Sequence, residues 1–417
     1  MPQIMMQNNL FMPRNSGIIA SIGEAITNFY ASPVNKGVIQ MTEYIWHSAN
    51  WPNFKIDYES LLPKLSRCHA LQGQLIQQLT SLGVDLELEA QLESLTQEAV
   101  KTAELEGEHY NQNAVRSSIA RRLGLSTAGL PSPPRNIDGL VDVLLDATGT
   151  DNRDLSSDRL KTWHAALFPT GWSGLHEIEV GQWRTESIQI VSGRAGKEKI
   201  HYEAPPANRV DHEMEVFIEW WQKSHPDLNN TDPVIRAGIA HYWFVAIHPF
   251  ADGNGRIARA LSDMALAQSD GAAKRSYSLS STIVENRDGY YSVLEKTSNG
   301  QGDITEWLDW LLDCLELSLK QSKSTIEKVL VLTHFWHNIS DISLNDRQIK
   351  VVKKLLDAGE NGFEGGLTAK KHQGMVKGSR ATLTRDLTDL VSKKILILTG
   401  ERKAARYNLN WELTRKN

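Results

Sequence analysis

Apolar residues recur every three or four positions along most of the chain, a spacing typical of helices with one buried face. In the first third it predicts helices at 58–81, 86–107 and 115–125. A proline-rich stretch at 130–135 then interrupts the pattern, because proline ends helices. Six further helices are predicted downstream, at 137–147, 158–166, 212–225, 233–247, 255–268 and 304–318. The sequence therefore predicts a mainly α-helical protein.

One segment inside this helical region alternates apolar and polar residues, as a half-buried strand does. Within residues 183–206, Ile188 and Ile190 alternate with polar neighbours, a glycine-containing turn follows at 192–196, and alternation resumes at 200–202. The pattern predicts a β-hairpin within the helical core.

The C-terminal residues 343–417 follow a different plan. Helical patterns at 346–358, 367–375 and 379–396 precede two short strand patterns around a basic turn at 400–403. Three helices followed by a hairpin predict a winged helix-turn-helix. Its third helix and wing carry a group of basic residues, Arg380, Arg385, Lys393, Lys394, Arg402, Lys403 and Arg406. Such a patch suits DNA phosphates, and protein docking or dimerisation is an equally open use of the unit.

Chain length bounds the domain organisation, since 417 residues exceed one ordinary core. We expect an N-terminal extension without a clear folding pattern at 1–40, a helical domain at 41–130, a core at 131–320, a linker helix at 321–342 and the winged helix at 343–417. Aromatic residues become frequent from Met41 onward, and Met41 is a candidate alternative translation start.

Composition narrows the class of protein. A formal net charge of −5 gives no overall attraction to nucleic acid or anionic membrane. The sequence shows no secretory signal and no apolar run of membrane-spanning length, so we expect a cytoplasmic protein. Cys68 and Cys314, far apart and without a metal-binding spacing, are expected to be buried thiols.

Residues with chemical potential are concentrated in HPFADGNGRIAR, at 248–259, between two predicted helices. Gly253 and Gly255 free the backbone to turn its N–H groups toward an anion, and the following helix directs its positive end to the same place. Arg256 and Arg259, about one turn apart, add charge suited to phosphate. Together they predict a phosphate-binding loop.

Two further residues of this stretch suggest catalysis. A carboxylate beside a phosphate site is repulsive unless a cation lies between them, so Asp252 implies Mg²⁺. Histidine ordinarily titrates near neutral pH, so His248 is suited to take a proton from an attacking hydroxyl. Each feature alone is common in turns and on surface helices, but their coincidence within one loop favours a functional site.

The stretch resembles the signature of the Fic family, His-Pro-Phe-x-Asp/Glu-Gly-Asn-Gly-Arg-x-x-Arg, with every fixed position present. The resemblance implies a helical Fic fold and transfer of AMP from ATP to a protein hydroxyl, with pyrophosphate leaving. By position it implies the general base His248, the Mg²⁺ ligand Asp252, the anion nest Gly253, Asn254 and Gly255, the phosphate-binding Arg256, and Arg259 at the γ-phosphate.

The resemblance also suggests uses for two other regions. Fic proteins carry a flap that registers the target as an added strand, so Ile188 and Ile190 are candidate clamp residues, with a merely structural hairpin as the alternative. The segment around Tyr290 and Tyr291 resembles the part of the family that lines the adenine pocket, and Tyr291 is the preferred contact.

A second motif lies upstream, where Thr102, three further residues, Glu106 and Gly107 resemble the family's inhibitory pattern. Its position matches the class in which an inhibitory helix precedes the core. If the Glu106 carboxylate pairs with Arg259, it occupies the group that should orient the γ-phosphate. ATP would then bind with its α-phosphate turned away from in-line attack.

The flanks extend the resemblance, because both EYIWHSANWPNF at 43–54 and the C-terminal unit are similar to companions of Fic cores. We therefore predict an adenylyltransferase that modifies a target protein or itself, is inhibited by Glu106 and uses ATP and Mg²⁺. Two alternatives stay open: a nucleotide-sensing DNA-binding regulator, and an enzyme that also removes AMP from its target. Whether the chain forms a homodimer is also left open.

Overall fold

The computed structural model describes residues 18–21, 44–80, 84–125, 127, 130–149, 154–192, 199–228, 231–269, 276–359, 362–363, 366–401 and 404–415. It divides the chain into two compact units, Met1–Ser322 and Lys323–Asn417. The regions expected at 41–130 and 131–320 both belong to the first unit. Most of the N-terminal extension, the hairpin turn at 193–198, Arg402 and Lys403 lie outside the described residues.

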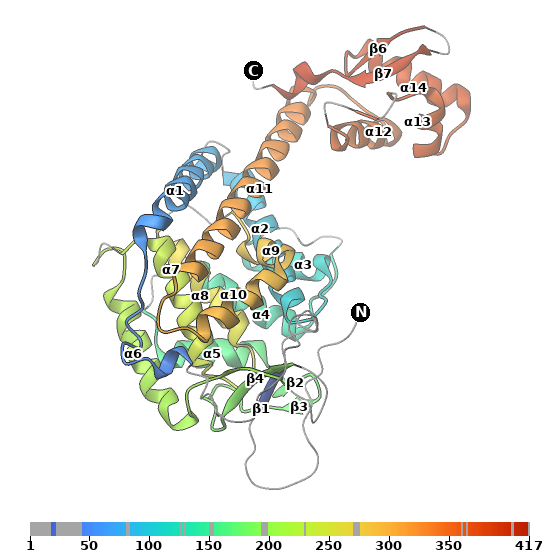
Figure 1. Cartoon of the computed structure of the whole chain (residues 1–417). Coiled ribbons are helices and arrows are strands. Elements are labelled where there is room, and N and C mark those ends of the chain that lie inside the picture. The colour runs from blue at the N-terminus through green and yellow to red at the C-terminus, as the bar shows by residue number, and fades with distance from the viewer. Residues whose placement is uncertain are drawn as a thin grey trace, which may run out of the picture. The chain divides into compact units, whose positions relative to one another are not determined.

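The first unit is mainly helical (Figure 1). Its helices are α1 (Tyr58–Thr80), α2 (Val84–Leu105), α3 (Gln112–Arg122), α4 (Arg135–Thr148), α5 (Ser157–Leu167), α6 (Val210–Lys223), α7 (Pro233–Ile247), α8 (Asn254–Ser269), α9 (Leu279–Glu285), α10 (Arg287–Ser298) and the first part of α11 (Thr305–Asn338). Every helix predicted from the apolar spacing is present. The apolar spacing did not predict α9 and α10, which are short.

Helix α11 runs on past the predicted end at 318, through the segment expected as a separate linker helix. The residues between, KQSKSTIEK, are polar but contain neither glycine nor proline, so nothing in them stops a helix. In the first unit α11 lies beside α1, where Lys64 bonds to Asp309 and Asp313 at 2.8 Å.

Helix α7 forms the centre of the first unit, and nearly all of its residues are buried. It is apolar on every side, as expected of a helix enclosed by others. The Asp232 side chain caps it by accepting from Val234 N at 2.9 Å and Ile235 N at 3.3 Å, with Pro233 at the first position. Gly238 allows close contact with α11, because a Cβ there would lie 2.4 Å from the Leu308 side chain.

The predicted hairpin is confirmed as β4 (Ile188–Ser192) and β5 (Lys199–Glu203), which pair antiparallel. The other edge of β4 pairs in parallel with β1 (Ile18–Ser21). A second hairpin, β2 (Trp172–Ser173) and β3 (His176–Glu177), is too short to leave an alternating pattern.

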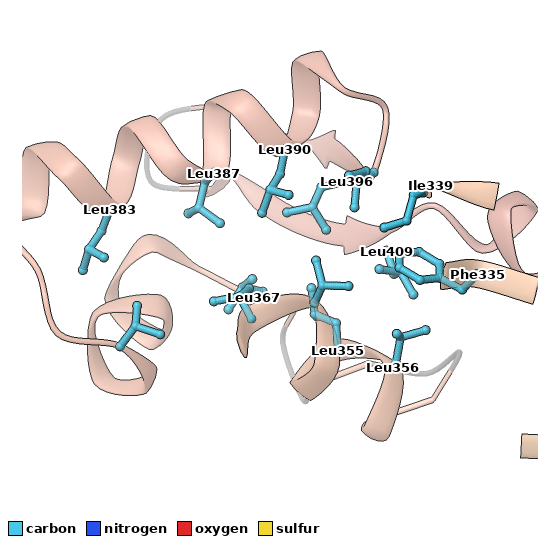
Figure 2. Close-up of a cluster of buried hydrophobic side chains, with 14 residues drawn as sticks. Phe335, Ile339, Leu355, Leu356, Leu367, Leu383, Leu387, Leu390, Leu396 and Leu409 are labelled. Atoms are coloured by element: carbon cyan, nitrogen blue, oxygen red, sulfur yellow. The ribbon is translucent and has the colours of Figure 1, made fainter. Parts of the chain in front are cut away.

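The second unit contains the end of α11, α12 (Asp346–Asp357), α13 (Ala369–Met375), α14 (Arg380–Ser392), and the antiparallel strands β6 (Leu396–Thr399) and β7 (Arg406–Leu409). This is the order expected of a winged helix. Its core joins Phe335 of α11 and Ile339, just after that helix, to leucines of α12, α14 and the strands (Figure 2). Arg380 and Arg385 are exposed on α14.

Two further expectations concern single residues and membrane insertion. Cys68 and Cys314 are confirmed as buried free thiols, and burial raises the pKa of each to about 12. Among the described helices, none combines the length and apolarity that a bilayer crossing requires.

Candidate active site

The loop at 248–254 joins the end of α7 to the start of α8. His248 ends α7 in the left-handed conformation, with φ 52° and ψ 59°, and Gly253 has φ +77° just before α8. The Asn254 side chain closes the loop, accepting from Phe250 N at 3.0 Å and donating to Phe250 O at 2.8 Å. Because this side chain is used within the loop, the predicted anion nest would involve Asn254 through its backbone only.

Phe250 anchors this loop in the core and has no exposed surface. Its ring stacks on His164 at a centroid distance of 4.2 Å and an interplanar angle of 6°. His164 accepts from Gly181 N through Nδ1 at 2.9 Å, so the loop is fixed to α5 and to the segment before the flap.

His248 is held as a neutral imidazole with a defined tautomer. Its Nδ1 faces the Val245 carbonyl at 3.3 Å, so Nδ1 carries the proton and Nε2 presents a lone pair. Burial, followed by the charge of Arg184, lowers its pKa to about 4. At neutral pH this side chain is therefore able to accept a proton.

His248 lines a cavity of about 1090 Å³. The same cavity is lined by Asp252, Arg256 and Arg259 of the motif, by Glu106 at the end of α2, and by Tyr291. This volume lies just above the roughly 300–1,000 Å³ typical of small-molecule sites, so the cavity is large enough for such a ligand. The structure thus brings the residues of both sequence motifs to one place, although they are about 150 positions apart.

Asp252 lies at the wall of this cavity beside Arg256. One carboxylate oxygen accepts from the Ser173 hydroxyl of β2, and the other accepts from Gly253 N at 2.5 Å and lies 3.9 Å from Arg256 Nη2. No group of three potential protein ligands occurs in the described part of the chain. A single carboxylate still fits Mg²⁺, which commonly binds one or two carboxylates together with substrate phosphates.

Helix α2 ends with a Schellman motif that directs two carboxylates toward the arginines. Glu108 N donates to Ala103 O and Gly107 N donates to Glu104 O, both at 3.0 Å, with Gly107 at φ +79°. Glycine suits this position because it adopts positive φ without strain. The turn places Glu106 and Glu108 on either side of Gly107.

Three hydrogen bonds join Arg259 to this segment. Its Nε donates to Thr102 Oγ1 at 2.6 Å, and its Nη2 donates to Thr102 O at 3.2 Å and to Glu106 Oε1 at 2.6 Å. Burial alone would raise the pKa of Glu106, but the Arg259 and Arg256 guanidinium groups hold it below its usual value. The predicted pairing of Glu106 with Arg259 is therefore present in the structure.

The second arginine of the motif contacts the second carboxylate. Arg256 Nη1 donates to Glu108 Oε1 at 3.2 Å, and its guanidinium lies 4.7 Å from the centroid of the Phe168 ring. Tyr110 donates to the other oxygen of Glu108. The buried Nε of Arg256 has no hydrogen-bond partner among the described residues.

Helix α2 has an additional anchor that the sequence did not indicate. Glu98 is 3% exposed and accepts from Ser278 Oγ at 2.8 Å, from Ser280 N at 3.1 Å and from the Ser280 hydroxyl. These groups lie at the start of α9, where a carboxylate satisfies the unpaired N–H groups of a helix.

Tyr290 and Tyr291 face different surroundings. Tyr290 is buried, and its hydroxyl pairs with His241 Nε2 at 2.9 Å, whereas Tyr291 reaches Leu105 O at 3.4 Å. Both border the cavity. The assignment of Tyr291 to the adenine contact stays a prediction, and its partly exposed position is compatible with it.

Ile188 and Ile190, the candidate clamp residues, lie on β4. Ile188 is fully buried and Ile190 is 8% exposed, and both pack with Tyr202 in a small apolar cluster. Ile190 also borders the cavity. Since both side chains point into the protein, any added target strand would contact the backbone of β4, whose outer edge here pairs with β1.

Comparisons with known proteins agree with this site. Residues 154–266 match the Fic/DOC family. This part of the chain is thus a Fic/DOC family domain. Residues 44–125 match a domain of unknown function, DUF4172.

Relatives with a recorded activity share only part of this chain. "Protein adenylyltransferase Fic" of Nematostella vectensis is 26% identical over 147 residues, 34% of this chain and 29% of that protein. The Drosophila erecta protein of the same name is 35% identical over 106 residues, 25% of this chain and 19% of its own length. The chain thus matches less than a third of either relative.

Solved structures with similarity are also Fic proteins. A Fic family protein from Desulfovibrio desulfuricans G20 is 21% identical, with a TM-score of 0.48, covering 86% of this chain and 98% of that one. Fic-1 from C. elegans is 20% identical, with a TM-score of 0.44, covering 65% and 74%.

Proposed function

We propose that the Fic domain transfers AMP from ATP to a hydroxyl side chain of a target protein or of the chain itself. The observation that carries this proposal is the convergence, on one cavity, of a neutral imidazole, a carboxylate and two guanidinium groups. Phosphoryl transfer needs mainly positioning and charge neutralisation, which this set of groups supplies. Relatives named protein adenylyltransferase support it.

In this reaction the target hydroxyl oxygen attacks the α-phosphorus of ATP. The bond from that phosphorus to the bridging oxygen of the β-phosphate breaks, and pyrophosphate leaves. His248 Nε2 takes the hydroxyl proton. Arg256 and Arg259 bind phosphate oxygens, and Asp252 would hold Mg²⁺, which neutralises phosphate charge when bound.

We propose further that the structure represents an inhibited state. Arg259 has three contacts with the end of α2, so the γ-phosphate must compete with Glu106 for it. ATP that binds without Arg259 lacks the contact that aligns its α-phosphate for attack. The same carboxylate at the cavity wall would also suit a water-activating role in AMP removal, the alternative that stays open.

The test uses ATP labelled at the α-phosphate. We expect Glu106→Gly to transfer label to protein in the presence of Mg²⁺, and Glu106→Gly combined with His248→Ala to transfer none. If the single variant transfers no label to itself or to any protein of a cell extract, the proposed activity is wrong. Incubation of the wild-type chain with AMP-bearing protein tests the reverse direction.

For the second unit we propose binding to duplex DNA. Arg380 and Arg385 are exposed on α14, the helix that a winged helix would place in the major groove. We expect the chain to retard a labelled DNA duplex in a gel at moderate salt. Arg380→Ala combined with Arg385→Ala should abolish this retardation. Unretarded duplex with the full chain would instead favour protein docking.

A further inference from the structure

Arg184 lies three residues after Gly181, whose backbone N–H donates to His164. It is a buried charge without a carboxylate partner among the described residues. It is 3% exposed, and burial lowers its pKa to about 10. A buried guanidinium is unfavourable unless its donors are satisfied. Here they are satisfied by carbonyl groups alone, which is unusual enough to require an explanation.

The carbonyls belong to two functional elements. At the end of α7, Arg184 Nε donates to His248 O at 2.7 Å, Nη2 lies 3.4 Å from Ile247 O, and the backbone N donates to Pro249 O at 2.9 Å. At the flap, Nη1 donates to Glu186 O at 2.8 Å and Nη2 to Pro205 O at 2.5 Å. One side chain thus joins the base of the flap to the turn that carries His248.

This position matters because His248 is strained. A left-handed conformation is unfavourable for a residue with a Cβ and persists only where the surroundings hold it. Arg184 holds the carbonyl of that residue and a neighbouring carbonyl at the negative end of α7, where a cation is favourable. The direction of the imidazole follows from the backbone turn that Arg184 fixes.

The charge also acts on the imidazole. His248 is faced by Arg184 from the segment before β4, by Asp252 from the loop and by Glu106 from the end of α2. The two carboxylates favour an imidazolium, whereas burial and Arg184 oppose it. The charge of Arg184 thus acts together with burial to keep the ring neutral.

We propose that Arg184 is a positioning residue for the general base, setting both the direction and the charge state of the His248 ring and coupling the ring to the flap. The proposal rests on the proposed function only for its kinetic part. Arg236 offers a matched control, since it is fully buried in α7 and bonds to Ser224 Oγ, Gln268 Oε1 and Trp221 O, away from the cavity.

The first experiment follows the His248 ring by NMR in the full chain labelled in its histidines, with His248→Ala for assignment. We expect Arg184→Gln to raise the pKa of His248 by about one unit, and Arg236→Gln to leave it unchanged. An unchanged titration in Arg184→Gln, or an equal shift in Arg236→Gln, overturns the electrostatic role.

The second experiment measures label transfer in the Glu106→Gly background with Arg184→Lys, which keeps the charge but cannot bridge the carbonyls. We expect kcat to fall by about tenfold or more with KM for ATP unchanged and with the His248 titration close to that of the parent. A full kcat, or a loss confined to KM, overturns the positioning role. If the background itself transfers no label, the proposed function fails, while the titration still decides the role of Arg184.

Discussion

The two carboxylates at the end of α2 contact the motif arginines unequally, so removing their charges should have unequal effects. Glu106 Oε1 lies 2.6 Å from Arg259 Nη2, with side chains 27% and 3% exposed. Glu108 Oε1 lies 3.2 Å from Arg256 Nη1, and its side chain is 38% exposed. We predict that Glu106→Gln raises the rate of label transfer much more than Glu108→Gln does.

The magnitudes follow from these geometries. A hydrogen bond between charged groups in a poorly solvated site contributes about 1.5–3 kcal/mol, so freeing Arg259 should raise the rate by about 10- to 150-fold. The Glu108 pair is more exposed and screened by water, and such pairs contribute about 0.2–1 kcal/mol, or about 1.5- to 5-fold. Glutamine keeps the shape of glutamate, so the packing of α2 is little changed.

The assay measures initial rates of label transfer at ATP concentrations below saturation, with His248→Ala in each background as the control for chemistry. The reasoning is refuted if Glu108→Gln activates as strongly as Glu106→Gln. It is also refuted if Glu106→Gln leaves the rate of label transfer unchanged while Glu106→Gly raises it. The volume of the side chain, and not its charge, would then block the γ-phosphate.

Three further predictions concern stability, the α2 anchor and the metal. Burial lowers the pKa of His164, His241 and His248 to about 4, 3 and 4. Because unfolding lets these neutral rings take up protons, the first unit should lose stability as pH falls below about 6.5. The loss should be roughly 2 kcal/mol per histidine at pH 5. A urea midpoint that is equal at pH 7 and pH 5 would contradict this. Glu98→Ala should cost about 2–4 kcal/mol in urea unfolding and raise basal label transfer, since α2 leads to Glu106; unchanged unfolding and basal rate would show that this anchor is dispensable. Ser173→Ala should shift the Mg²⁺ concentration for half-maximal rate by a few-fold, because the hydroxyl competes for Asp252; an identical Mg²⁺ dependence would exclude that competition.

The fold was predictable wherever the apolar spacing was long and bounded. Helix α7 has a capping aspartate, a first-position proline and a continuous apolar face, so its bounds were predicted to the residue. Helices α9 and α10 together contain fewer than twenty residues and begin at Leu279 and Arg287, and each is too short to show a clear helical period. Tertiary packing, not local pattern, decides such short helices.

The site was predictable in its contiguous part and in one long-range pair. The 248–259 loop carries all its chemistry in one stretch, and Glu106 was found through a motif with its own spacing. Ser173, Glu98 and Arg184 have no such signal, because each is a single polar residue whose partners come from another element. Only the three-dimensional structure could assign them.

The ending of α2 explains why a glycine follows Glu106. Thr102 and Glu106 are four residues apart, so they share one helical face and both reach Arg259. The chain must then leave the helix at once, because a further turn would direct the next carboxylate away from Arg256. Gly107 allows this reversal, and a residue with a Cβ would resist its positive φ. Fraying of this last turn would release Arg259 while Glu98 keeps the rest of α2 in place, and terminal turns are the parts of a helix that open at least cost. The proposed inhibition would thus depend on a few residues at a helix end, where small changes in contact would free both arginines for a nucleotide.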